Sequence, residues 1–203
     1  ETRTRVRFSA ELEADTLLLN GRAETKAARG AARCLAELRA IAGAREYAAV
    51  ESTNNFPTGA GLASSASGYA ALVTAAAAAL GLPADAADLI NISRQGSGSA
   101  PRSLLAGIVV LEADAQHVHC RSIAAPEDWP LHTIVAVTSR AEKAVGSTEG
   151  MERSRNTSPF YHGWLDRHPP DMEAAVASVQ QRDFERLAEL AEHSCLKMHA
   201  LAM

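Results

Sequence analysis

The chain has 203 residues, 47% of them hydrophobic, and a formal net charge of −4, which suits a globular protein able to bury a core. The mild charge and the absence of a basic patch exclude a typical nucleic-acid-binding protein. The longest apolar run, residues 70–82, is too short and too alanine-rich to span a bilayer, and residues 1–5 do not resemble a signal peptide, so we expect a cytoplasmic protein.

The cysteine and histidine content argues against a metal centre. Cys34, Cys120 and Cys195 are odd in number, widely spaced and without a C-x-x-C pair. They therefore predict reduced thiols rather than a disulfide framework or a zinc site. His193 and His199 lie near the end of the chain with no second cluster at metal-ligand spacing, so we expect structural histidines and no metal ligands.

Alternation of polar and apolar residues predicts strands in the first quarter of the chain. The expected strands are residues 4–9, 16–19 and 47–53. Between the second and third strands, residues 27–42 carry Leu35, Leu38 and Ile41 at helical spacing beneath charged residues. This pattern predicts an amphipathic helix.

A loop of small residues, NNFPTGAGLASSAS at positions 54–67, joins the third strand to a helix predicted over residues 65–80. Glycine and alanine let the backbone approach an anion, and a helix N-terminus supplies free N–H donors and the positive end of its dipole. The loop has neither the lysine of a Walker sequence nor the spacing of a dinucleotide fingerprint. Two interpretations stay open from these residues alone: a phosphate-binding loop, or an ordinary start of a packed helix.

A second segment, residues 92–103, follows a helix predicted over residues 84–93 and reads ISRQGSGSAPRS. It brings unhindered amides, the hydroxyls of Ser97 and Ser99, and the guanidinium of Arg102 into one short stretch. Such a set suits a carboxylate and a phosphate bound together, because arginine pairs with a carboxylate through two charge-assisted hydrogen bonds. The alternative is a flexible turn with a solvated arginine.

The rest of the chain predicts a strand pair and then a new unit. Paired strands are expected at residues 108–112 and 118–122, and a further strand at residues 133–138. Helices are expected to begin at Pro159, with Ser158 as its cap, and at Met172 and Asp183. The cluster PEDWP at positions 126–130 is typical of a loop, so we place a domain boundary near Trp129.

The two motifs together resemble the diphosphomevalonate decarboxylases, a branch of the GHMP kinase superfamily. The resemblance is carried by residues 54–69, by the stretch RQGSGSAPRS at positions 94–103, and by residues 143–164 and 191–200. Pro101 stands where the family usually has cysteine, a change that stiffens the backbone before Arg102.

The resemblance implies an α+β, two-domain GHMP kinase fold. A ribosomal-protein-like β-α-β domain would occupy residues 1–129, and the beginning of a ferredoxin-like domain residues 130–203. The family carries substrate-binding lysines before the position of Glu1 and its catalytic aspartate after that of Met203, so we expect the chain to be a fragment that is inactive alone.

The resemblance also implies roles for individual residues. Arg102 and Ser65 are the expected catalytic residues. The expected ATP-binding residues are Pro57, Gly59, Ala60, Gly61, Leu62, Ala63, Ser64 and Ser65. The expected substrate-binding residues are Ser97, Gly98, Ser99, Arg102 and Ser147.

The activity implied is the ATP- and Mg²⁺-dependent conversion of mevalonate diphosphate to isopentenyl diphosphate, ADP, phosphate and carbon dioxide, in a homodimer of the mevalonate pathway. Two alternatives in the same superfamily are a phosphomevalonate decarboxylase and a mevalonate 3-kinase that phosphorylates without decarboxylating. An alternative of another class is a non-catalytic anion-binding or scaffold protein.

Overall fold

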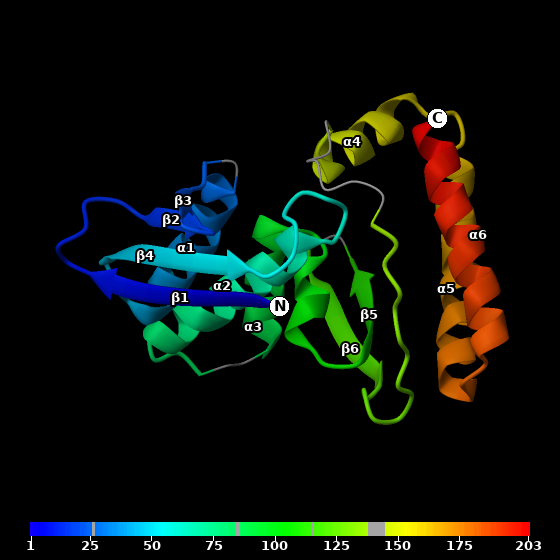
Figure 1. The fold of residues 1–203 in the computed structure, drawn as a ribbon, viewed down its shortest axis with the longest axis horizontal. Coiled ribbons are helices and arrows are strands. Elements are labelled where there is room, and N and C mark those ends of the chain that lie inside the picture. Colours follow the sequence, from blue (N-terminus) through cyan, green and yellow to red (C-terminus); the bar gives the residue numbers. More distant parts are fainter. Residues whose placement is uncertain (26, 84–85, 115, 138–144) are drawn as a thin grey trace. The chain divides into compact units, whose positions relative to one another are not determined.

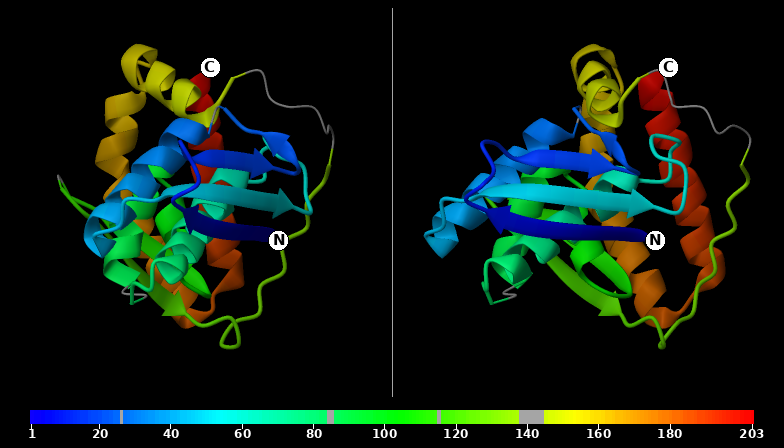
Figure 2. Two further views of the ribbon diagram at one scale, coloured as in Figure 1. Left: turned by 90° about the vertical axis from the view of Figure 1, so that its left-hand side faces the viewer. Right: turned by 60° about the vertical axis from the view of Figure 1, so that its left-hand side comes forward.

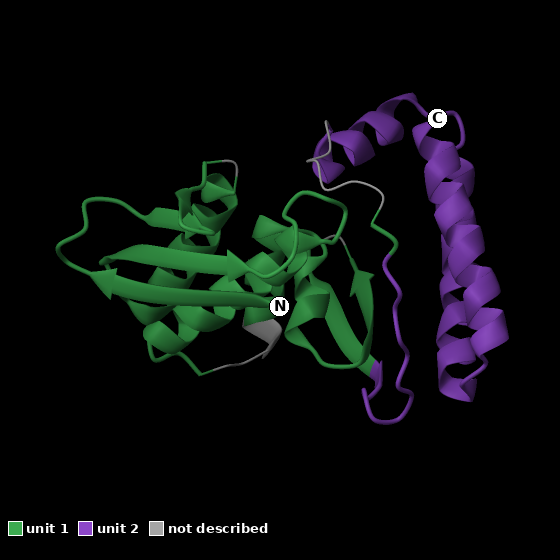
Figure 3. Cartoon of the chain, in the orientation of Figure 1, with its two compact units in different colours: residues 1–122, 136–142 green, residues 123–135, 143–203 purple. Residues whose placement is uncertain are grey.

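The computed structural model describes residues 1–25, 27–83, 86–114, 116–137 and 145–203. The chain forms two compact units, shown in different colours in Figure 3. The first unit comprises Glu1–Ser122 and Ala136–Glu142, and the second comprises Ile123–Val135 and Lys143–Met203. Both helices and strands are present, so the predicted α+β class is confirmed.

A four-stranded sheet forms one layer of the first unit. Its order is β1-β4-β2-β3, with β1 (Thr2–Ser9) antiparallel to β4 (Tyr47–Asn54) and β2 (Thr16–Leu19) parallel to β4. The short strand β3 (Arg22–Ala23), which the sequence did not predict, pairs with β2 after a tight turn. The central strand β4 leads directly into the small-residue loop.

Side-chain alternation explains why the N-terminal segment forms an outer strand. Arg3, Arg5 and Arg7 are exposed, whereas Val6 and Phe8 pack against the core. Successive side chains of a strand point to opposite faces, so this segment has one solvated and one packed face.

Three helices of the first unit lie on one face of this sheet, as both views in Figure 2 show. They are α1 (Ala28–Ala42), α2 (Ser64–Ala79) and α3 (Ala86–Gly96). The buried alanines of α2 let its backbone approach the sheet and both neighbouring helices closely. The core contains Leu35, Leu38, Val50, Val73 and Ile92, each 1% exposed or less.

A bidentate ion pair fixes α1 to the start of β4. Arg39 donates to both oxygens of Asp15, at 2.7 and 2.9 Å, and the Ala48 N–H donates to Asp15 Oδ1 at 2.8 Å. Both charged side chains are largely buried, so the pair is strengthened by the low local dielectric.

The first unit ends with a short helix and a hairpin. The 3-10 helix η1 (Ala100–Leu104) precedes the paired strands β5 (Ile108–Ala113) and β6 (Val118–Ala124), and this strand pair confirms the sequence prediction. The Val118 N–H donates to Asn91 Oδ1 at 3.1 Å, which ties the hairpin to α3.

The second unit is helical, with α4 (Ser147–Thr157), α5 (Tyr161–Gln181) and α6 (Phe184–Ala202). Figure 1 shows α5 and α6 side by side and antiparallel, and an ion pair between Asp171 and Lys197 joins them. The predicted helix start at Asp183 is confirmed, and Asp183 caps α6 by accepting from the Arg186 N–H at 2.9 Å. Within the described ranges, no helix has the length and apolar character needed to cross a membrane.

The helix boundaries predicted after residue 145 need correction. Ser158 ends α4 rather than capping the next helix, and the predicted helices from Pro159 and Met172 are one continuous helix, α5, that contains Pro169 and Pro170. Proline keeps a helical φ but removes a hydrogen bond and crowds the preceding turn. The sequence signal therefore suggested a break, and packing of α5 on α6 outweighs that cost.

The strand predicted over residues 133–138 is also wrong for residues 133–137, which are irregular, and residue 138 lies outside the described residues. Ile134 is 95% exposed and Val137 is 57% exposed. A strand is stabilised by hydrogen bonds to a neighbour, and the described residues supply no neighbouring strand for this segment.

Cys34 on α1 makes a pH-dependent contribution to stability. Its thiol is fully buried and donates to the Ile92 carbonyl of α3 at 3.3 Å. Burial raises the pKa of this thiol to about 11, from 9.0. The unfolded state releases its proton first, so the contribution is fully present below pH 9 and is lost as the pH rises through the folded pKa.

We expect the free energy of unfolding to fall by up to a few kcal/mol between roughly pH 8 and pH 11 through this one group. Chemical denaturation at both pH values measures the change. Cys34→Ala should remove this part of the pH dependence, whereas the matched change Cys195→Ala, at an exposed thiol, should leave it intact. Equal pH dependence in the two variants would contradict the assignment.

Candidate active site

The loop between β4 and α2 has a left-handed backbone at three positions. The φ angles are 73° at Gly59, 85° at Gly61 and 52° at Ala63. Glycine adopts this region without strain, but a residue with a Cβ does so at a cost of about 1–2 kcal/mol. Ala63 immediately precedes α2, so this strained turn lies where the chain enters the helix.

The N-terminus of α2 differs in detail from the prediction. The helix predicted from residue 65 begins at Ser64, its N-cap is Ala63, and no side chain of the described residues caps it. Ser64 Oγ instead accepts from the Gly59 N–H at 3.3 Å, which closes the loop on itself. The first N–H groups of a helix lack partners inside the helix, so this end of α2 offers donors to an anion.

The two serine-containing segments meet in space. Ser65 Oγ, in the first turn of α2, lies 3.4 Å from Ser97 Oγ, which follows the last residue of α3. Ser97 Oγ in turn lies 3.3 Å from Ser99 Oγ. Three hydroxyl groups from residues up to 34 positions apart in the chain therefore form one polar row, in which each hydroxyl is within hydrogen-bonding range of the next.

Arg102 follows this row within η1, and its side chain is exposed. Burial raises the pKa of Cys120 on β6, and the positive charge of Arg102 partly offsets that rise. The guanidinium therefore lies near β6 and remains accessible to a ligand. Pro101 is fully buried in the first turn of η1, where proline fits without loss of a helical hydrogen bond.

A second set of polar groups at the base of the loop was not predicted. Thr2 Oγ1 on β1 donates to Asn54 Oδ1 at 2.6 Å and lies 2.8 Å from Ser67 Oγ, and Asn54 Nδ2 donates to Thr58 Oγ1 at 3.3 Å. These bonds connect β1, the loop and α2. The sequence signal was available, because Thr2 and Thr4 occupy positions of β1 that share a face with Val6 and Phe8.

Two expected substrate residues are less closely tied to this row. Gly98 is exposed and lies between Ser97 and Ser99 in the chain. Ser147 is the first residue of α4 and belongs to the second unit, where the sequence motif suggested a turn rather than a helix. Its role at the site stays a prediction. Within the residues that the structure describes, no group of three His, Cys, Asp or Glu side chains is arranged to hold a metal ion.

Comparison with known proteins identifies the family. The diphosphomevalonate decarboxylase-like N-terminal domain matches residues 1–124, and the mevalonate 5-diphosphate decarboxylase C-terminal domain matches residues 133–203. The chain belongs to the diphosphomevalonate decarboxylase family. This confirms the resemblance stated from the motifs.

Individual relatives agree with this assignment. The diphosphomevalonate decarboxylase of Candida albicans is 37% identical over 219 residues, which cover 100% of this chain and 60% of that protein. The diphosphomevalonate decarboxylase of Ganoderma lucidum is also 37% identical, and its match covers 98% of this chain and 55% of that protein. The chain thus spans little more than half the length of these relatives.

Solved structures share the fold. Mevalonate diphosphate decarboxylase from Staphylococcus aureus superposes with a TM-score of 0.83 at 36% identity, covering 98% of this chain and 62% of that one. The protein called MDDEF, solved in complex with MVAPP, AMPPCP and magnesium, superposes with a TM-score of 0.83 at 35% identity and the same coverage. The predicted GHMP-type architecture is therefore confirmed over the matched part of the family's chain.

The left-handed Ala63 generates a stability prediction. We expect Ala63→Gly to raise the free energy of unfolding by up to about 1 kcal/mol, because glycine relieves the strain at this φ. The matched control is Ala78→Gly, at an exposed position inside α2, which should lower stability by roughly 0.5–1 kcal/mol. Equal destabilisation by both changes would show that the loop stores no strain.

Proposed function

We propose that this chain forms the ATP- and substrate-binding part of a diphosphomevalonate decarboxylase. The reaction converts ATP and mevalonate diphosphate to ADP, phosphate, carbon dioxide and isopentenyl diphosphate. Membership of the family supports the reaction type, and the relatives named as diphosphomevalonate decarboxylases support the substrate. The chain spans only part of the length of these relatives, so the activity is proposed for a full-length protein that contains this segment.

One observation supports this site above all others: the 3.4 Å approach of Ser65 to Ser97. This approach joins the loop of residues 57–65, which is suited to a nucleoside triphosphate, with the segment of residues 97–102, which is suited to a small acid. Phosphoryl transfer needs donor and acceptor held side by side and in line, since catalysis here is mostly positioning and charge stabilisation. A single loop would bind an anion without serving that purpose.

The chemistry of the substrate accounts for the residue types. A 3-hydroxy acid loses carbon dioxide readily only after its tertiary hydroxyl becomes a leaving group, so the hydroxyl first receives the γ-phosphoryl group of ATP. The C–O bond to phosphate and the C–C bond to the carboxylate then break together, and the new carbon–carbon double bond takes the electron pair. Arg102 orients the carboxylate, and Ser97 and Ser99 bind substrate oxygens.

The residues present fit a nucleotide. The left-handed turns at Gly59 and Gly61 shape the loop ahead of α2, and the uncapped start of α2 offers backbone N–H donors. The loop of residues 57–65 binds the triphosphate through these groups, with Ser65 next to the transferred phosphoryl group. Magnesium held with the triphosphate at this loop would neutralise phosphate charge, and a relative solved with AMPPCP and magnesium supports its use here.

The role of Ser147, the location of the protein and its oligomeric state are further parts of this proposal. Ser147 contributes to the phosphate end of the substrate site, and the protein is a cytoplasmic homodimer. The role of Ser147 and the homodimer rest on the sequence resemblance, and the cytoplasmic location rests on composition. Subcellular fractionation tests the location, and light scattering tests the dimer.

Product analysis tests the proposed function directly. The full-length protein, given ATP, Mg²⁺ and mevalonate diphosphate, should release ADP, phosphate and carbon dioxide in equal amounts. ADP without carbon dioxide would indicate a 3-kinase, and preference for mevalonate phosphate would indicate the alternative decarboxylase. AMPPCP binding with no turnover of any of these acids would identify an anion-binding protein.

Replacing the arginine tests its assigned role. Arg102→Leu should lower kcat by roughly 10²–10³-fold, because it removes the charged donor that orients the carboxylate. Binding of AMPPCP should change little, since the proposed triphosphate-binding loop of residues 57–65 is intact. The matched control is Arg45→Leu, at an exposed arginine before β4, which should keep normal rates. Near-normal carbon dioxide release by the Arg102 variant would remove this residue from the site.

A further inference from the structure

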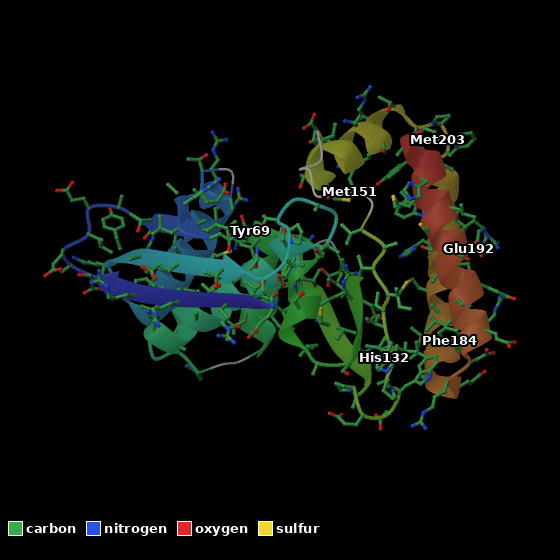
Figure 4. The ribbon with its side chains drawn as sticks, viewed as in Figure 1. Tyr69, His132, Met151, Phe184, Glu192 and Met203 are labelled. Atoms are coloured by element: carbon green, nitrogen blue, oxygen red, sulfur yellow. The ribbon has the colours of Figure 1, made fainter. Side chains whose placement is uncertain are left out.

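Tyr69 lies on α2 four residues after Ser65, one helical turn away on the same side of the helix. Its hydroxyl donates to the Ala27 carbonyl, just before α1, at 2.9 Å. Burial raises the pKa of Tyr69, so the phenol remains a neutral hydrogen-bond donor at physiological pH. Figure 4 labels this residue among the helices of the first unit.

The ring of Tyr69 fills the space left by two glycines on different helices. A Cβ built on Gly96, the last residue of α3, would overlap the ring itself. A Cβ built on Gly30 of α1 would lie 2.8 Å from Tyr69 Cζ and closer still to the hydroxyl. No real Cβ contact is that short, so α1 and α3 both require glycine in order to approach this ring.

Polar contacts hold the same end of α3 against α1. Arg33 Nη2 donates to the Gln95 carbonyl at 2.7 Å, and the Gln95 side chain donates to Glu37. Cys34 donates to the Ile92 carbonyl one turn earlier. The residues directly before Ser97 are thus fixed by α1 on one side and by the Tyr69 ring on α2 on the other.

We propose that Tyr69 is a positioning residue that sets the separation between Ser65 and Ser97. Ser65 shares a helix with the ring, and Ser97 directly follows the glycine in contact with it. The thickness of the ring therefore determines how closely the loop of residues 57–65 approaches the segment of residues 97–102. The inference rests on the proposed function for its catalytic consequence, but the geometric relation is independent of the reaction.

Chemical cross-linking measures the spacing without substrate. In the full-length protein, Ser65→Cys with Ser97→Cys places two thiols where the hydroxyls are 3.4 Å apart, near enough for a disulfide after a small movement. Mild oxidation and peptide mapping give its rate of formation. Adding Gly96→Ala should slow this rate at least tenfold, because the new methyl group displaces Ser97. Adding Gly68→Ala should not, because a Cβ there meets nothing within 4 Å.

Kinetics with native serines provide the functional readout. Gly96→Ala should lower kcat by about 10–100-fold, as expected for a reactive group misplaced by about 1 Å, while the KM for ATP stays within about threefold. Tyr69→Leu combined with Gly96→Ala should recover roughly tenfold of kcat, because the smaller side chain makes room for the methyl group. Tyr69→Phe keeps the ring and should stay within about threefold of the parent protein.

The outcomes separate the two proposals. A parent protein without turnover but with a cross-linking rate sensitive to Gly96→Ala refutes the proposed function and supports the role of Tyr69. A rate of disulfide formation that Gly96→Ala leaves unchanged refutes the role of Tyr69. The role is also refuted if the effects of Gly96→Ala and Tyr69→Leu on kcat simply multiply in the double variant. If Gly96→Ala does not fold, Gly30→Ala acts on the same ring. Failure of Tyr69→Leu, which removes the ring, to relieve the cross-linking defect of Gly30→Ala likewise refutes the role.

Discussion

The packing of three helices around one aromatic ring is the constraint on which this site depends. Tyr69 of α2 contacts Gly30 of α1 and Gly96 of α3, and only residues without a Cβ permit both approaches. Because Gly96 directly precedes Ser97, a packing relation in the core becomes a distance between two hydroxyl groups at the surface. Close-packed interiors transmit such constraints because they contain little free volume.

Two kinds of interaction maintain the loops at either side of this ring. The loop between β4 and α2 is held by the hydrogen bond from the Gly59 N–H to Ser64 Oγ and by the linked side chains of Thr2, Asn54 and Ser67 beneath it. The segment that contains Ser97 and Arg102 is held by α1 through the Gln95 carbonyl and by the buried Pro101. Preorganised donors of this kind need little rearrangement when charge develops on a transferred phosphoryl group.

Local sequence signals worked where a pattern is self-contained. The strands β1 and β4, the helix α2 and the start of a helix at Asp183 follow from alternation, alanine content and helix-start signals within a few residues. The signals failed where contacts with neighbouring strands or helices determine the secondary structure. Residues 133–137 have strand-like composition but no partner strand among the described residues, and Pro169 and Pro170 lie within a helix that packs on α6. The N-cap at Ala63 was missed because its left-handed φ depends on the turns at Gly59 and Gly61.

The sequence by itself determined the family, the α+β class and the two segments that carry the candidate site, because small residues, serines and one arginine in fixed order are local chemical properties. Only the tertiary structure decided that Ser65 and Ser97 meet, that Thr2 supports the loop, and that Tyr69 lies between Gly30 and Gly96. These relations join residues 27 to 65 positions apart in the chain. Their distances are set by how the helices pack, and no local pattern records that packing.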